Sequence, residues 1–461
     1  MSTDECALRV TNAEGLTRNH KQDKLIRISR WAVLAVLFFS PWRLEAPIIL
    51  PGFDPVNVPF AAYVPRMRPA DALALVAIVT YAWAGWPNRR RLLAPNARVW
   101  SMSLAGLVTW AALSVAWAAH GGLGVAFAVR LALWVLLALR VMCDSLPPRA
   151  IALSLFAGLM LNAVIGVGQV LAQGNLGLAA LGELPIGLSY PGVSVIGPDD
   201  AHLIRLYGLS AHPNVMGGYA AVALLLASGL VVARSLRRRW MLPAWAIGWL
   251  ALLLSFSRSA LLGFLVGGAV TAIILIKGRL IDLRRSMPIV VTLLAGGLAL
   301  LAVLGPVVIE RVIVSESTVE QISIQERVDL SATAASIIVA HPITGVGIGN
   351  FRLASHDWTS PPVYTDWVHH IPLLVASELG LVGLALGLAG VAAIIGEGIA
   401  RWRDAQLDAW SALAAGAIIA LLVIMQFDHY LWTSSQGTYV WGGLTGWWIG
   451  RQGSYHALHV S

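Results

Sequence analysis

The sequence has little charge for its length. Asp, Glu, Lys and Arg account for 12% of the 461 residues, whereas 57% are hydrophobic and the mean hydropathy is +0.73. A soluble domain of this size cannot bury so much apolar surface, so soluble fold classes are excluded. The composition predicts an all-α polytopic membrane protein, with the lipid bilayer as the solvent for most of the chain.

Cysteine is also scarce. Cys6 and Cys143 are the only two, too few and too badly placed for a disulfide framework or a zinc cluster. The net charge of +8 could suggest a nucleic-acid partner. However, the basic residues fall between apolar runs, which is typical of membrane topology and not of a binding stripe. We therefore expect no nucleic-acid partner.

What the chain has in abundance is apolar runs long enough to cross a hydrocarbon core of about 30 Å. We predict about twelve transmembrane helices, at residues 31–49, 69–86, 99–119, 122–143, 149–172, 214–233, 240–256, 259–276, 287–309, 371–397, 409–427 and 436–450. Residues 1–26 are polar, and the run that follows them lacks a small-residue cleavage site. The first span is therefore expected to be retained, although Pro41 interrupts it.

The basic residues orient these spans. With the N-terminus inside, most of the 32 lysines and arginines fall in short inner segments, and every long loop lies outside. Both termini are therefore predicted to be cytoplasmic. The predicted parts are a cytoplasmic tail at 1–30, spans one to nine at 31–309 with an outer loop at 173–213, an outer catalytic and lid loop at 310–370, spans ten to twelve at 371–450, and a cytoplasmic tail at 451–461.

Four outer segments carry polar groups that lipid would reject. They are "RLYGLSAHPNVMGGYAA" with Arg205, His212 and Asn214, "LLLSFSRSALLGF" with Arg258, "SIQERVDLSATAASIIVAHPITGVGIGNFR" with Arg327, and "TDWVHHIPLLVASELGLVG" with His369 and His370. Converging arginines match phosphate oxygens and need an anion to balance them. Histidine accepts a proton from a hydroxyl near neutral pH. Together at a lipid surface, these groups favour glycosyl transfer from a lipid-linked pyrophosphate to a hydroxyl.

Simpler interpretations stay open for several outer residues. Four outer arginines are interpreted as side chains that only anchor the chain at the lipid headgroups: Arg43, Arg66, Arg68 and Arg352. Arg130 lies within the fourth span, where an ionisable residue suggests function, but it is close enough to the outer end to reach the headgroups. His212 precedes a proline and could cap the sixth helix through local hydrogen bonds.

In these segments the chain resembles the O-antigen ligase family, within the group of O-antigen ligases, O-antigen polymerases and bacterial protein O-oligosaccharyltransferases. The resemblance rests on "RLYGLSAHPN", "SFSRSALLGF", "ERVDL" followed by "HPITGVGIGNF", and "VHHIPLLVASELGLVG", between residues 200 and 385. It implies a metal-independent, inverting enzyme of the glycosyltransferase C superclass, without a cofactor. The implied location is the inner membrane of Gram-negative bacteria, with the active site on the periplasmic side. The implied partners are undecaprenyl-pyrophosphate-linked O-antigen and lipid A-core.

The resemblance also implies roles for individual residues. Catalytic roles are implied for Arg258, Arg327 and His369, and binding of the pyrophosphate or sugars is expected of Arg205, His212, Asn214, Arg130 and His370. The family usually has Asn directly after its histidine, where this chain has His370, so His369 and His370 compete for the role of base. Glu378, deeper in the same apolar run, is interpreted as a buried structural acid.

Other functions remain compatible with the sequence. An O-antigen polymerase or a protein O-oligosaccharyltransferase would use the same kind of donor and a different acceptor. A twelve-helix secondary transporter would also place both termini inside, but no repeat relates the two halves of this chain. The long outer loops contain no Asp-x-Asp element and no His/Glu pair with metal-ligand spacing, so no metal site is expected.

Overall fold

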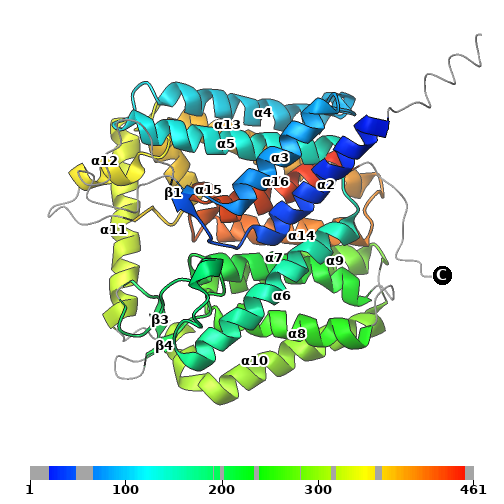
Figure 1. Cartoon of the computed structure of the whole chain (residues 1–461), viewed down its shortest axis with the longest axis vertical. Helices are drawn as coiled ribbons and strands as arrows, with labels where there is room; N and C mark the ends of the chain where they lie inside the picture. The colour runs from blue at the N-terminus through cyan, green and yellow to red at the C-terminus, as the bar shows by residue number, and fades with distance from the viewer. Residues whose placement is uncertain are drawn as a thin grey trace, which may run out of the picture.

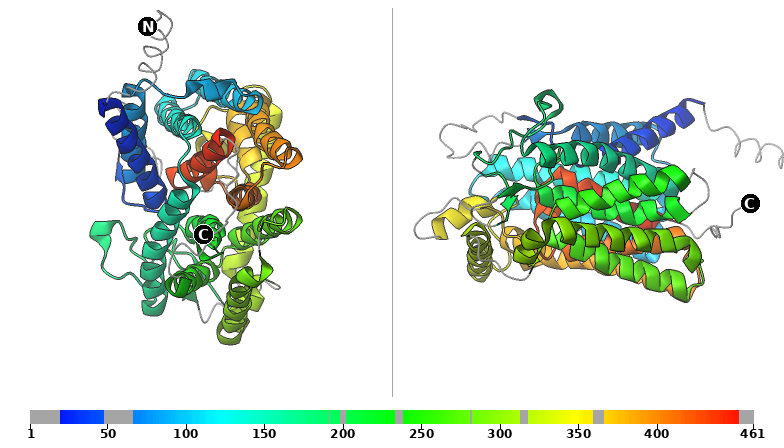
Figure 2. Two further views of the ribbon diagram at one scale, coloured as in Figure 1. Left: turned by 90° about the vertical axis from the view of Figure 1, so that its right-hand side faces the viewer. Right: turned by 90° about the horizontal axis from the view of Figure 1, so that it is seen from below.

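Most helices of the chain run side by side in one bundle (Figures 1 and 2). The computed structural model describes residues 20–47, 66–190, 192–197, 202–232, 238–280, 282–312, 318–358 and 366–451. Its α-helices are α2 (His20–Phe39), α3 (Pro69–Trp83), α4 (Pro95–Ser114), α5 (Gly121–Cys143), α6 (Pro148–Ala172), α7 (Pro213–Val232), α8 (Arg238–Leu254), α9 (Arg258–Lys277), α10 (Leu283–Val312), α11 (Thr318–Ala340), α12 (Phe351–Trp358), α13 (Ile371–Arg403), α14 (Ala409–Ile424), α15 (Tyr430–Thr433) and α16 (Ser435–Gly450). Two antiparallel pairs of two-residue strands, β1 (Ala46–Pro47) with β2 (Arg66–Met67) and β3 (Val195–Ile196) with β4 (Leu203–Ile204), accompany them.

The prediction of an all-α membrane protein is confirmed at the level of fold class. Within the described residues, six helices are long and apolar enough to cross a membrane: α5, α6, α7, α9, the Arg284–Gly305 part of α10, and α13. The other predicted spans are also helical, and α3, α8 and α14 are apolar but shorter. Twelve crossings and the side that each loop faces therefore stay predictions.

The first span was placed wrongly in the sequence. The helix covers His20–Phe39 instead of residues 31–49, so it begins within the predicted tail. Its end is set by Pro41, because a proline cannot continue an α-helix without losing a hydrogen bond. The rest of the predicted tails, residues 1–19 and 452–461, lies outside the described residues.

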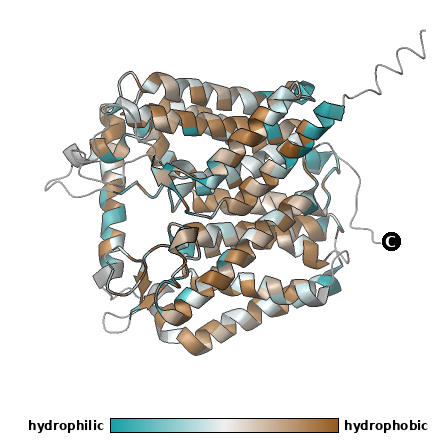
Figure 3. Cartoon of the chain, in the orientation of Figure 1, coloured by the Kyte–Doolittle hydropathy of each residue, from teal (hydrophilic) through white to brown (hydrophobic). Residues whose placement is uncertain are grey.

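One end of the bundle collects the long connections. In Figure 1, α11 stands across the left-hand end of the horizontal helices, and α12, β1 and the β3–β4 pair also lie toward that end. The described parts of the predicted outer loops thus gather at one end, which we call the site end. Figure 3 shows that the bundle helices are largely apolar, whereas α11 carries hydrophilic stretches. This contrast suits a helix that lies over the bundle end and not inside the membrane.

The core of the bundle is packed through small residues. Every residue of α7 except Ser228 is buried, and α16 is buried throughout. Against α14, α9 approaches so closely that a Cβ added to Gly267 would lie 2.3 Å from the carbonyl oxygen of Gly416. Small residues at such crossings let backbones meet where lipid supplies no hydrophobic driving force between helices.

A kink in α13 holds the C-terminal end of α11. Gly380 has φ 67° and ψ −174°, a backbone conformation essentially reserved for glycine. The break exposes backbone groups of α13, and the turn after α11 bonds to them. The amide of Gly347 donates to the carbonyl of Glu378 at 2.8 Å, and the amide of Leu381 donates to the carbonyl of Pro342 at 2.8 Å. The turn "HPITGVGIGN" is therefore the clamp between α11 and α13.

We expect Gly380→Ala to destabilise the protein strongly. A Cβ there would lie 2.0 Å from the carbonyl oxygen of Ile343, and the strained φ and ψ would add about 1–3 kcal/mol. The measurement is thermal unfolding of the purified full chain in detergent. Gly387→Ala is the matched control, because it lies on the same helix and no atom lies within 4 Å of its added Cβ. Equal unfolding temperatures for the two variants would contradict the clamp.

Candidate active site

Five segments bring polar side chains together at the site end. Arg205 precedes α7, Arg258 begins α9, Arg327 lies on α11, and His369 precedes α13. The fifth segment is the connection between α14 and α15, which carries Asp428. Their charges act on one another: Asp428, Arg258 and Arg327 each influence the pKa of Arg205. The segments that the sequence singled out therefore converge.

A chain of hydrogen bonds links the first of these segments to the last. The Nη2 group of Arg205 donates to Oδ1 of Asn214 at 2.6 Å, and Nδ2 of Asn214 donates to Oδ2 of Asp428 at 2.7 Å. The guanidinium also donates to the Ser255 carbonyl at 2.8 Å and to Oγ of Ser194 at 2.7 Å. These bonds hold the side chains of Arg205 and Asn214 in place at the site end.

Burial and neighbouring cations lower the pKa of Arg205. The residue is only 3% exposed. Burial lowers the pKa of Arg205 to about 10, and the charges of Arg327 and Arg258 act in the same direction. The group is still cationic at neutral pH. An incoming anion would relieve the repulsion among these three arginines.

Asp428 is the acid at the centre of this network. Burial alone would raise its pKa, but His429, His369 and His212 and the hydrogen bond from Asn214 together hold the pKa below its usual range. Its Oδ1 also accepts the amide of His429 at 2.9 Å. Asp428 is therefore ionised at neutral pH and supplies negative charge next to the histidines.

Nδ1 of His369 makes no local hydrogen bond. Within the described residues, this nitrogen is buried and has no hydrogen-bond partner. The ring lies edge-on to His429, with 5.1 Å between the ring centroids. Burial lowers the pKa of His369 to about 4, and His429 adds to the shift, whereas Asp428 and Asp366 oppose it. The ring is thus neutral at neutral pH, with two carboxylates near enough to stabilise its protonated form.

The other two candidate histidines serve as helix caps. Nδ1 of His370 accepts the amide of Leu373 at 3.2 Å at the start of α13. Nδ1 of His212 accepts the amide of Asn214 at 3.1 Å, and burial lowers its pKa to about 3. A side chain that satisfies the first amides of a helix stabilises that end. Nδ1 is therefore engaged locally in His370 and His212 but not in His369, and the hydrogen bond of His212 agrees with the capping interpretation.

Arg258 and Arg327 approach the site from two different elements. Ser257 caps α9, its Oγ accepting the amide of Ala260 at 3.4 Å, and Phe256 before it has a positive φ of 46°. This tight turn leaves Arg258 exposed between buried neighbours. Arg327 lies on α11, and burial lowers its pKa against the attraction of Asp428. The charge of Arg258 also acts on Arg327, so the two arginines lie near each other, and Arg327 lies near Asp428.

Packing fixes α11 relative to His369. Leu330, Ala334 and Ile337 of α11 form one buried cluster with Phe351, Trp367, Val368 and Leu374. Trp367 and Val368 directly precede His369 in the chain. Together with the clamp at Gly380, this cluster sets the distance between the arginine of α11 and the histidine before α13.

Arg130 lies elsewhere. Its Nη1 donates to the carbonyl of Thr433 at 3.0 Å, and its guanidinium lies 5.1 Å from the centre of the Phe127 ring. The side chain points into the protein instead of extending to the headgroups. A link to the site remains, because Oγ1 of Thr433 bonds to Nδ1 of His429 at 2.8 Å. Glu378 is fully buried and accepts Nε1 of Trp432 at 3.0 Å, in agreement with a structural role.

The sequence missed Asp428 and His429. They follow directly on the predicted eleventh span, in "QFDHY", and an acid beside a histidine in a predicted outer turn was the available signal. His429 also belongs to a group of three possible metal ligands, whose donor atoms all lie within 4.8 Å of one another: Asp366, His369 and His429. Two imidazoles and a carboxylate are donors that transition metals accept. The group joins two distant segments, so spacing along the sequence could not reveal it.

Comparison with known families adds to this geometry. Residues 243–388 match the family model described as O-antigen ligase. This match supports the O-antigen ligase family. The match contains Arg258, Arg327 and His369, so the resemblance predicted from the motifs is confirmed, and it supports a membrane glycosyltransferase-like function of the ligase and polymerase group. No curated protein matches the chain.

Proposed function

We propose that the protein is an O-antigen ligase of the Gram-negative inner membrane. It would transfer O-antigen polysaccharide from undecaprenyl pyrophosphate to lipid A-core on the periplasmic side. The observation that carries the proposal is the meeting of Arg258 and Arg327 with His369 at one end of a membrane bundle. These are the groups that a pyrophosphate leaving group and a hydroxyl nucleophile require.

The arginines would act on the leaving group. As the bond between C1 of the sugar and the phosphate oxygen breaks, negative charge grows on the pyrophosphate. Arg258 and Arg327 would stabilise that charge where it develops, which is how preorganised donors lower a barrier. Their positive charge would neutralise the pyrophosphate, as a bound metal ion does in other phosphate sites. This charge supports the proposal of metal-independent transfer.

His369 would act on the acceptor. Its neutral ring would take the proton from the acceptor sugar hydroxyl while that oxygen forms a bond to C1 on the face opposite the pyrophosphate. Attack from the opposite face inverts the configuration at C1. Asp428 and Asp366 would stabilise the imidazolium that forms, because both oppose the lowering of the His369 pKa.

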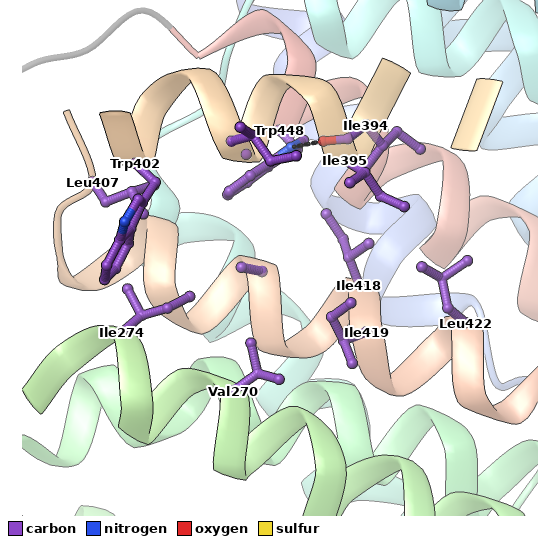
Figure 4. A pocket seen from close by; sticks show the side chains of 13 residues that line it. Val270, Ile274, Ile394, Ile395, Trp402, Leu407, Ile418, Ile419, Leu422 and Trp448 are labelled. Atoms are coloured by element: carbon purple, nitrogen blue, oxygen red, sulfur yellow. Dashed lines mark hydrogen bonds between the residues drawn. The ribbon is translucent and has the colours of Figure 1, made fainter. Parts of the chain in front are cut away.

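Two apolar grooves suit the lipid part of a donor. The first, about 190 Å³ in volume, has Ile371 and Pro372 in its lining, directly after the histidine pair. The second, about 270 Å³, lies between α9, α13, α14 and α16, and its lining includes Trp402 and Ile418 (Figure 4). Ile394 and Leu422 line both grooves, so an apolar path leads away from His369 along α13.

A cell that lacks the gene tests the proposal. With a ligase missing, polymerised glycan is expected to stay on undecaprenyl pyrophosphate and to disappear from lipopolysaccharide. Separation of lipopolysaccharide by gel electrophoresis and extraction of the lipid-linked pool measure the two. Lipopolysaccharide capped with a single glycan unit would instead identify a polymerase and contradict the proposal.

A further inference from the structure

Three arginines around one carboxylate form a second cationic cluster at the site end. The strand pair β1–β2 brings two segments together, with Pro47 opposite Arg66. Glu45 then receives three arginines: Arg66 Nη1 at 2.6 Å and Arg43 Nε at 3.3 Å on Oε1, and Arg68 Nη2 at 3.1 Å on Oε2. We call Arg43, Arg66 and Arg68 around Glu45 the Glu45 cluster. The sequence treated these arginines as separate headgroup anchors, whereas in the structure they share one carboxylate.

The charges of the cluster do not balance among the described residues. One carboxylate neutralises one of three guanidinium groups, which leaves two positive charges. Arg130 adjoins the cluster, since its Nη2 reaches the carbonyl of Arg66 at 3.5 Å. The charge of Asp71 acts on Arg130 and opposes its positive charge, and the amide of Arg68 donates to Oδ2 of Asp71 at 2.8 Å. An excess of two positive charges matches a phosphate monoester, which is close to doubly negative at neutral pH.

Part of the cluster is also short of hydrogen-bond acceptors. Nε of Arg68 is buried and has no partner within the described residues. The side chain as a whole is only 12% exposed. A buried charged donor without an acceptor is costly. Repulsion from Arg66 and Arg68 also acts on Arg43, whose pKa is lowered first by burial and then by these neighbours, against Glu45. A phosphate oxygen would relieve both problems.

The cluster is joined to the candidate active site through the start of α16. Nη1 of Arg68 donates to Oγ of Ser434 at 2.9 Å and to Oγ of Ser435 at 3.0 Å. Thr433, the preceding residue, accepts Arg130 through its carbonyl and bonds His429 through its hydroxyl. A ligand on the cluster therefore lies beside the segment that carries His429, and not among Arg205, Arg258 and Arg327.

We infer that the Glu45 cluster is a second phosphate site, which takes the phosphate monoester of a lipid at the membrane surface. Arg43 and Arg66 are 27% and 33% exposed in their side chains, so they receive the headgroup, while Arg68 and Glu45 form the floor. In the transfer reaction this lipid is the acceptor, held by its phosphate while its sugar reaches His369. The assignment to the acceptor rests on the proposed function, whereas binding of a lipid phosphate does not.

Binding to the purified full chain in detergent tests the site. The probes are dihexanoyl phosphatidic acid, dihexanoyl phosphatidylcholine and inorganic phosphate, titrated by native mass spectrometry or thermal shift. We expect phosphatidic acid to bind at least tenfold more tightly than phosphatidylcholine, and the variant Arg43→Gln/Arg66→Gln to lose that preference. Glu45→Gln, which removes the competing carboxylate, is expected to tighten binding. Arg284→Gln, an exposed arginine at the start of α10, is the control and should change nothing.

Three results would overturn the inference. They are equal binding of phosphatidic acid and phosphatidylcholine, unchanged binding in Arg43→Gln/Arg66→Gln, and weaker binding in Glu45→Gln that is correctly folded. Inorganic phosphate that binds as tightly as phosphatidic acid would overturn the assignment to a lipid. In a transfer assay, Arg43→Gln/Arg66→Gln should raise KM for phosphorylated acceptor lipid and leave KM for the donor unchanged. If wild type shows no transfer, the proposed function fails, while the binding titration still decides the site.

Discussion

Replacing His369 with alanine is expected to lower kcat for glycan transfer by about 10²–10⁴-fold, the contribution of a positioned general base. The reason is that Nδ1 of His369 has no partner among the described residues, whereas Nδ1 of His370 caps α13. His370→Ala is the matched control. It should lose about 1 kcal/mol of stability with the cap and keep most of its kcat. Initial rates of transfer and the unfolding temperature are measured on both purified variants.

The pH dependence follows from the same histidine. Only the neutral ring can accept the hydroxyl proton, so the rate falls when pH drops through the pKa of His369. Because that pKa is lowered to about 4, kcat/KM should change little between pH 7.5 and about 5.5.

A normal rate in His369→Ala together with a large loss in His370→Ala would assign the base to His370 instead.

Removal of Arg258 or Arg327 is expected to lower kcat by about 10²–10³-fold each, the usual effect of losing one donor to a developing anion. The charges of both side chains act on Arg205, and the charges of Arg258 and Asp428 act on Arg327. Lysine at either position keeps the charge but loses the two-pronged contact with phosphate, so partial recovery is expected. Initial rates at saturating donor, compared with the Arg284→Ala control, measure the effect.

The two arginines should also depend on each other. If both hold one pyrophosphate, the double variant Arg258→Ala/Arg327→Ala should lose less than the product of the single effects, because the second change acts on a leaving group already poorly held. Strictly multiplicative losses would show that the arginines act on different groups. Rates close to wild type in either single variant would remove that arginine from the site.

The sequence predicted which segments meet at the site end. Each of its four motifs contains residues that must hold a local conformation, such as the turn before Arg258 or the cap at His370, and local constraints leave a signature in the chain. The order of spans then placed the motifs at one end, because successive helices reverse direction. The family match over residues 243–388 covers the three residues for which the motifs implied catalytic roles.

What the sequence did not predict depends on contacts between distant residues. Asn214 and Asp428 are 214 positions apart, and no local pattern joins them. No sequence pattern singles out Glu45, and only the β1–β2 pair places it among three arginines. The same applies to the role of Gly380, which only the docking of the "HPITGVGIGN" turn explains. In each case the partner, and not the residue itself, determines the role.

The most direct measurement is transfer by the purified protein, with undecaprenyl-pyrophosphate-linked glycan as donor and lipid A-core as acceptor, in the presence of EDTA. We predict product with an inverted linkage, at the same rate with and without the chelator, and transfer lowered about 10²–10⁴-fold in His369→Ala. Activity that EDTA removes and a divalent metal restores would assign Asp366, His369 and His429 to a metal ion. Absence of product from well-folded wild type would contradict the account as a whole.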